Sequence, residues 1–249
     1  MKRILFYLLF FVTITGISQS QQWFDQANTL YNKGEYEEAI KYYEKILDNG
    51  KHSAELYFNL ANAHYKLNHI APSIYNYEKA LRLAPNDTDI KNNMAFAKNM
   101  TIDAIDAIPE LGLSRFVKSM TNILSFDGWA YVAVSAIVIF VLLYLLYYFN
   151  SSTRKKRLAF VSSVLCLMIS MLALTLAFHK YNLDQNDKPA IVFAKESQVK
   201  NEPNLRSEEI FKLHEGTKVQ VLETVNDWKR IRLSDGKTGW ILSEAIKEI

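Results

Sequence analysis

The sequence predicts a multidomain membrane protein, in which an all-α repeat domain is followed by a two-helix transmembrane hairpin and a small all-β barrel. Three observations predict this fold class. The N-terminal segment repeats itself at a regular period, two long apolar runs occupy the middle of the chain, and short alternating segments between turn residues fill its end. The 249 residues are 49% hydrophobic, but the apolar residues concentrate in the middle, which favours two small domains over one large core.

These features set the expected domain boundaries. They are a signal peptide over 1–20, a repeat domain of two repeats plus a capping helix over 21–100, an amphipathic juxtamembrane segment over 101–128, transmembrane helices over 129–149 and 158–179 joined by a cytoplasmic basic turn over 150–157, a linker over 180–188, and the β domain over 189–249.

The first twenty residues have the pattern of a secretory signal, a basic start followed by a short apolar run. Ser18 and Ser20 occupy the minus-three and minus-one positions of a cut before Gln21. The alternative is an uncleaved anchor, although the apolar run ends well short of the roughly 20 residues that a span needs. In both cases the residues after Gln21 are exported.

The two apolar runs, Trp129–Phe149 and Leu158–Phe178, contain no charged residue. Each has about 21 residues and reaches about 30 Å as a helix, which is the thickness of a bilayer core. The short linker makes the helices antiparallel neighbours. Its four bases and no acid place the turn in the cytoplasm and both flanks outside it. The alternative is a buried hairpin of a soluble protein. The topology determinants are Arg154, Lys155, Lys156 and Arg157.

The interior of the hairpin is expected to anchor the protein rather than to conduct. Proton relays and ion paths usually need ionisable groups, and neither run has one. Cys166, the one cysteine, lies in the second run, has no disulfide partner and is expected to pack as a small apolar residue.

The repeat is visible when the sequence is shifted so that Ala27 falls on Ala61. The same shift brings Tyr31 onto Tyr65 and Tyr43 onto Tyr77, with further matches at Asn28, Ile40, Glu44, Lys45 and Leu47. This pattern resembles the tetratricopeptide repeat, a helix-turn-helix unit of the same period. The second unit departs from the family where Asn68 and Ser73 replace the usual Gly and Ala.

The resemblance implies a binding scaffold, because the first helices of stacked repeats line a concave groove. Asn28 and Asn62 occupy the same place in successive repeats and are expected to grip the backbone amides of an extended peptide. Neighbouring aromatic residues would offer flat contact at little cost in rotamer entropy. The alternative is that the aromatic side chains pack between repeats. The expected groove residues are Phe24, Asn28, Tyr31, Phe58, Asn62, Tyr65, Lys66 and Phe96.

Residues 101–128 carry apolar residues whose spacing after Pro109 approaches a helical period, with Arg115 and Lys118 on the other side. The segment is expected to form either a short amphipathic helix on the outer leaflet or a segment packed under the last repeat, and the sequence favours neither.

The C-terminal segment alternates as short strands over 190–193, 218–225, 228–233 and 238–242. Together with Leu213–Thr217 and Asp235–Ile241 these residues resemble the bacterial SH3-like domain. The resemblance implies binding of cell-wall peptides or proteins outside the cytoplasm. Trp228 is expected in the core, whereas Trp240 fits either the core or the surface. The expected ligand surface consists of Asn201, Pro203, Asn204 and Trp240.

The sequence offers no catalytic constellation. The five histidines fall in unrelated segments, and there is no HExxH, nucleophile elbow or phosphate loop. We therefore expect neither enzyme activity nor a metal or other cofactor, and the charge distribution does not suggest a nucleic-acid partner.

The order of signal, repeats, membrane hairpin and SH3-like domain resembles the BatE-type proteins of the Bacteroides aerotolerance operon. That resemblance implies an inner-membrane scaffold of a Gram-negative envelope, with partners that include von Willebrand factor A-domain proteins and a role in stress tolerance or envelope maintenance. The first alternative is a tether that binds peptidoglycan with its SH3-like domain. The more distant one is an enzyme with a site shared between domains.

Overall fold

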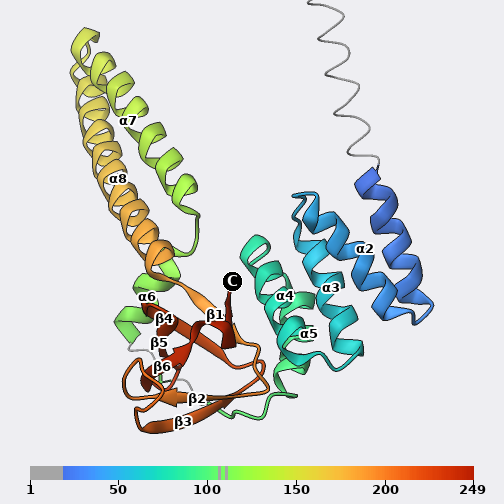
Figure 1. Ribbon diagram of the computed structural model, residues 1–249. Coiled ribbons are helices and arrows are strands. Elements are labelled where there is room, and N and C mark those ends of the chain that lie inside the picture. Colours follow the sequence, from blue (N-terminus) through green and yellow to red (C-terminus); the bar gives the residue numbers. More distant parts are fainter. Residues whose placement is uncertain (1–18, 106–107, 110–111) are drawn as a thin grey trace, which may run out of the picture. The chain divides into compact units, whose positions relative to one another are not determined.

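The computed structural model describes residues 19–105, 108–109 and 112–249 (Figure 1). The chain divides into two compact units, one formed by Met1–Ala107 together with Pro189–Ile249 and the other by Ile108–Lys188. The signal predicted over residues 1–20 lies outside the described residues except for its last two positions.

The helical part of the first unit consists of consecutive antiparallel helices. A first helix over residues 19–32 is followed by α2 (Tyr36–Asp48), α3 (Ala54–Lys66), α4 (Ile70–Leu83) and α5 (Thr88–Lys98). Ala27, Ala61 and Ala80 are fully buried where helices approach closely, and Tyr43 and Tyr77 fill the space between them. Close packing of small against large side chains explains why both kinds recur at the repeat period.

The turns inside the two helical hairpins share one backbone conformation. Gly34 has φ 84°, and Asn68, at the equivalent position of the second repeat, has φ 58°. Left-handed backbone is free for Gly and tolerated by Asn better than by most other residues. Asn68 is therefore a conformational equivalent of the usual Gly.

Ser73, where the repeat family usually has Ala, is fully buried in α4. Its Oγ donates a hydrogen bond of 3.0 Å to the Ala61 carbonyl of α3. A buried hydroxyl is tolerated when it is hydrogen-bonded. Serine in place of alanine therefore adds a hydrogen bond between the two helices of the repeat.

The second unit contains α6 (Gly112–Thr121), α7 (Phe126–Phe149) and α8 (Thr153–Asn186). Both α7 and α8 are long and apolar enough to cross a membrane, and their apolar side chains are mostly exposed. The core helices of a soluble protein would bury these side chains, so the exposure favours membrane association. Small buried residues line the contact between the helices, and Ser170 Oγ donates to the Ala133 carbonyl at 2.9 Å.

The boundaries of the hairpin differ from those predicted. The expected turn over 150–157 is shorter, because α8 begins at Thr153 and its first turn already contains Arg154–Arg157. At the other end α8 continues to Asn186, so most of the expected linker over 180–188 is helical. An ion pair of 3.0 Å between Lys180 and Asp184 spans one turn of this extension, and such pairs support an exposed helix.

The C-terminal domain is a seven-stranded antiparallel sheet in the order β3-β2-β6-β5-β4-β1-β7. The sheet is not closed, which corrects the predicted barrel: β3 and β7 are its two edges. The edge strand β7 has only three residues and pairs with β1, and the other edge, β3, pairs with β2. The elements are β1 (Pro189–Val192), β2 (Glu196–Lys200), β3 (Glu209–His214), β4 (Lys218–Val225), β5 (Trp228–Arg232), β6 (Thr238–Leu242), the short helix η1 (Ser243–Ala245) and β7 (Ile246–Glu248).

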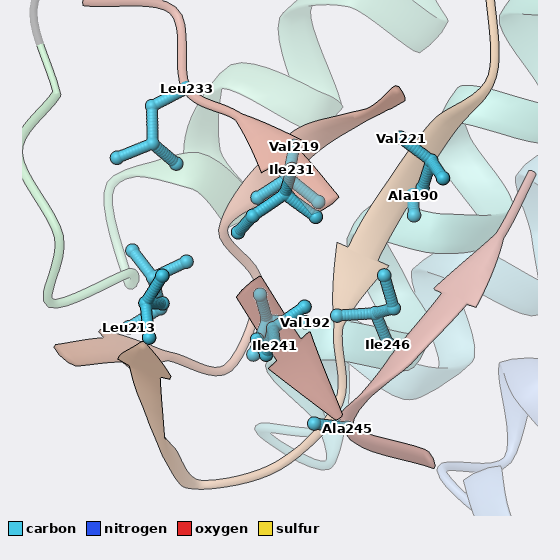
Figure 2. Close-up of a cluster of buried hydrophobic side chains, with 11 residues drawn as sticks. Ala190, Val192, Leu213, Val219, Val221, Ile231, Leu233, Ile241, Ala245 and Ile246 are labelled. Atoms are coloured by element: carbon cyan, nitrogen blue, oxygen red, sulfur yellow. The ribbon is translucent and has the colours of Figure 1, made fainter. Parts of the chain in front are cut away.

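One face of the strands forms an apolar core, shown in Figure 2, in which Val192, Ile231 and Ile241 are fully buried. Gly239 lets β6 approach β2, because a Cβ there would lie 2.4 Å from Val199 Cγ1. Trp228 is buried as expected, with 8% of its surface exposed.

Within the first unit, helical repeats and sheet share an apolar contact, which we call the seam. Ile191 of β1 is fully buried in the same cluster as Ile74 and Tyr75 of α4. Phe193 meets the Tyr75 ring edge-on, with centroids 5.7 Å apart. At Gly216, an added Cβ would lie 2.8 Å from side-chain atoms of the helical segment, so glycine is needed for this close approach.

Two nearly buried carboxylates also hold the seam. Asp103 Oδ2 accepts hydrogen bonds from the His214 backbone N–H at 2.7 Å and from Thr217 Oγ1 at 2.6 Å, while Asp103 Oδ1 lies 2.7 Å from His214 Nδ1. Glu78 of α4 pairs with Lys218 Nζ of β4 at 2.8 Å. Buried carboxylates are stable only when they are paired in this way.

Candidate functional site

The groove expected on the repeats is built around a hydrogen-bonded asparagine in each repeat. Asn28 Oδ1 accepts from the Tyr43 hydroxyl at 2.6 Å and from Asn59 Nδ2 at 3.1 Å. These three residues belong to the first helix, α2 and α3, so one amide oxygen connects both helices of the first repeat to the next repeat.

The second repeat has the same network at the equivalent positions. Asn62 Oδ1 accepts from the Tyr77 hydroxyl at 2.5 Å and from Asn93 Nδ2 at 3.0 Å. Burial raises the pKa of Tyr43 and of Tyr77, so both hydroxyls keep their protons and remain donors.

In the side-chain amides of Asn28 and Asn62, the oxygen and the nitrogen have different hydrogen-bonding roles. The oxygens of Asn28 and Asn62 are used inside the scaffold, whereas each Nδ2 carries two N–H donors. Both asparagines are only half-buried. Their amide nitrogens are the donors with which the two asparagines are expected to bind a peptide.

The expected aromatic groove residues are divided between packing and exposure. Phe24 packs edge-on against Tyr43 at 6.0 Å, and Phe58 is tilted against Tyr77 at 6.1 Å, so both rings brace the network and remain half-buried. Tyr31 and Tyr65 are also half-buried, while Lys66 is exposed and Phe96 has 60% of its surface exposed.

The structure brings the first-repeat residues together in two hollows. The larger, of about 560 Å³, is lined by Phe24 and Asn28, and the smaller, of about 260 Å³, by Asn28 and Tyr31. Phe58, Asn62, Tyr65, Lys66 and Phe96 line neither of them. The lining of the larger hollow also includes residues that were not anticipated from the sequence, namely Asp25, Lys51, His52 and Glu55. They make the wall charged as well as aromatic.

Asn59 and Asn93 were also missed as members of the site. Their spacing was the available signal, since Asn59 and Asn93 are as far apart in the chain as the two asparagines that they support.

On the sheet, Trp240 lies in the middle of β6 and is half-buried. It pairs across the sheet with Lys200 of β2 and Arg230 of β5, so a cationic side chain flanks it on either side. The loop that contains Asn201, Pro203 and Asn204 begins directly after Lys200.

That loop is held partly by its own polar groups. Asn204 Oδ1 accepts from the Arg206 backbone N–H at 3.0 Å, and the Ser207 hydroxyl accepts from the Glu202 backbone N–H at 2.9 Å. The indole face of Trp240 and the adjacent loop thus stay the expected ligand surface.

Within the described part of the chain, no group of three His, Cys, Asp or Glu residues is placed to hold a metal ion. His64 and His69 do lie together, with 3.3 Å between their Nδ1 atoms. Burial and the neighbouring His69 lower the pKa of His64 to about 4, so His64 is a neutral packing residue near pH 7.

A helical-repeat scaffold with a small antiparallel β domain defines a class of modular interaction proteins, and the comparisons agree with it. Residues 22–86 match the tetratricopeptide repeat family and residues 197–247 match the bacterial SH3 domain family. No curated protein matches the chain. The fold class is therefore confirmed as helical repeats, two long apolar helices and an antiparallel SH3-type domain with an open sheet. Both domain types typically bind ligands and do not catalyse reactions.

Proposed function

We propose that the protein is a non-enzymatic inner-membrane scaffold that binds protein partners on the periplasmic side through its repeats and its SH3-type domain. One observation carries this proposal. The two interaction modules pack into a single compact unit although two long apolar helices separate them in the sequence. Segments that share a buried seam must lie in the same compartment, so the helices would cross a membrane an even number of times.

The basic residues at the start of α8 support the choice of side. Arg154, Lys155, Lys156 and Arg157 are clustered at the closed end of the hairpin, and such clusters favour the cytoplasm. A periplasmic reporter fused after Ile249 is expected to be active, and a cytoplasmic reporter at the same place to be silent. The opposite pattern would reject this topology.

The groove supports protein binding because its donors are fixed before a ligand arrives. Asn28 and Asn62 are held by tyrosines in the same geometry, so little entropy would be lost when their amide nitrogens bind an extended peptide. The test is a peptide-library screen on the purified chain, followed by the Asn28→Ala, Asn62→Ala double variant. Unchanged peptide binding by the double variant would reject the groove, and Lys33→Ala on the exposed turn is the matched control.

The partner is proposed from the resemblance to the BatE-type proteins. On that basis the scaffold belongs to an aerotolerance or envelope-stress complex and binds von Willebrand factor A-domain proteins. Affinity capture from detergent-solubilised membranes tests this assignment. Recovery of such proteins with the native chain but not with the double asparagine variant is the expected result.

A second candidate function is a tether to peptidoglycan. The half-buried Trp240 between Lys200 and Arg230 favours it, because indole rings stack on sugars and the two cations suit carboxylates of a wall peptide. Co-sedimentation with purified cell wall separates the candidates. Wall binding that is lost in Trp240→Ala supports the tether, whereas no wall binding by a chain that still captures a protein partner rejects it.

A further inference from the structure

The seam contains a small pocket that is distinct from the groove on the repeats. Its volume is about 280 Å³, and it is lined by residues of α2, α3 and α4 on one side and of the β domain on the other. Three aromatic rings, those of Tyr57, Tyr75 and Phe193, and two lysines, Lys79 and Lys247, form much of its wall.

Both lysine side chains lie against these rings. Lys247 Nζ is 4.7 Å from the Tyr75 ring centroid and 5.7 Å from that of Phe193. Lys79 Nζ is 5.4 Å from the Tyr75 centroid. A ring face attracts an ammonium group without neutralising it, so the lysines are held in place and keep their charge available.

Neither lysine forms an ion pair with a carboxylate among the described residues. Other lysines of the same unit do, as Lys218 with Glu78 at 2.8 Å and Lys229 with Glu248. The pocket therefore has two ammonium groups and a single carboxylate, that of Glu44, in its lining.

Arg82 is a further cation near Lys79, and its Nη1 donates a hydrogen bond of 2.6 Å to the Ile249 main-chain oxygen. Burial, together with Arg82 and Lys247, lowers the pKa of Lys79. Glu44 is the acidic residue of the lining, and it is exposed at the pocket wall. His64, which also lines the pocket, is neutral near pH 7. An anion that enters would meet two ammonium groups, one exposed carboxylate, the polar side chains of Asn76 and His64, and otherwise aromatic and aliphatic walls.

We propose that this seam pocket binds a compact anion, a carboxylate or a phosphate, between Lys79 and Lys247. The volume lies at the lower end of the range for ligand sites, so it suits a small anion or one acidic side chain and not a folded segment. Because Lys79 belongs to the repeats and Lys247 to the sheet, the bound anion links the two modules. By mass action it stabilises their docked arrangement.

The test uses the full chain in detergent and two probes, inorganic phosphate and N-acetylglutamate, titrated by calorimetry at low ionic strength. Saturable binding of at least one probe is expected, and the probe that binds identifies the source of the anion. Lys79→Gln and Lys247→Gln should each weaken binding about tenfold, equivalent to about 1.4 kcal/mol, since both contacts are charge-assisted but partly solvated.

Lys195→Gln changes an exposed lysine of the same unit outside the pocket and should bind like the native chain. Circular dichroism checks that each variant is folded; Lys247 is exposed, so its variant is expected to fold. The proposal is overturned if neither probe shows saturable binding, or if the Lys79→Gln, Lys247→Gln double variant binds as well as the native chain. A negative result in this test would not contradict the proposed peptide binding in the groove, because none of the variants changes a groove residue.

Discussion

Replacing Asp103 by alanine should release the seam between the repeats and the sheet. The side chain is only 13% exposed and accepts bonds from the His214 amide, from the His214 ring and from the Thr217 hydroxyl. A hydrogen bond to a charged group contributes about 1.5–3 kcal/mol, and bonds to one carboxylate are not additive. Discounting for partial solvation, we expect the opening of the seam to become easier by about 3 kcal/mol, or roughly 100-fold.

Hydrogen–deuterium exchange at the His214 amide measures this directly, because that N–H is bonded to Asp103 Oδ2. Its protection factor should fall roughly 100-fold in Asp103→Ala. Asp87→Ala is the matched control: it removes the N-cap of α5, which costs about 1 kcal/mol locally, and should leave His214 unchanged. Equal protection in the native chain and in Asp103→Ala would refute the argument that this carboxylate holds the seam.

The same contact predicts a dependence on pH. Burial alone would raise the pKa of Asp103, but the hydrogen bonds from Thr217 and His214 outweigh burial and lower it. A lowered folded-state pKa means that the stabilisation is complete above the unfolded value of about 4 and is lost as the pH falls through the folded value. After correction for intrinsic exchange, protection of the His214 amide should therefore decline below about pH 4. The decline should be absent in Asp103→Asn.

Three further predictions concern the folding of the separate parts. Gly239→Ala should destabilise the sheet by about 1–3 kcal/mol in urea, since its Cβ would overlap Val199; a stability equal to the native value would contradict the close approach. Asn68 has φ 58°, so Asn68→Gly should change the thermal midpoint little, whereas Asn68→Val should lower stability by about 1–2 kcal/mol. Equal effects of the two substitutions would argue against a left-handed turn. Ser170→Ala removes the hydrogen bond to the Ala133 carbonyl and should weaken the α7–α8 contact by about 0.6 kcal/mol in a steric-trap or reversible-unfolding assay. An unchanged stability would show that this hydrogen bond is dispensable.

The helical repeats could be predicted from the sequence because they follow a strong local pattern. Small residues such as Ala27 and Ala61 recur at the repeat period, and each is buried where two helices cross. The central strands were also visible, since β4 and β6 alternate between buried and exposed positions. Periodicity reports burial on one face of a strand such as β6, whereas α4, which is buried at every position from Ser73 to Glu78, was indicated by the repeat period instead.

Other features left no such pattern. β2 and β3 lie at one end of the sheet; β2 has Val199 as its only apolar residue, and the apolar residues Ile210 and Phe211 of β3 are adjacent, so neither strand shows a clear alternation. The helical extension of α8 beyond the apolar run is polar and resembles a linker by composition. In the groove, the sequence indicated Asn28 but not that Tyr43 would occupy its oxygen, since that contact depends on how two helices face each other.

The seam was the least predictable feature of the fold, and it bears directly on the topology of the α7–α8 hairpin. Asp103 and His214 are 111 positions apart, and polar residues on unrelated segments carry no signal that they will meet. Yet their contact makes the repeats and the sheet one body, from which the chain departs before α6 and to which it returns after α8. In the proposed topology α7 and α8 cross a membrane, and a hairpin inserted into one compact unit then has both ends on the same side. The packing of the seam therefore supports the proposed topology independently of the basic residues at the closed end of the hairpin, and loss of the seam should allow the repeats and the sheet to separate.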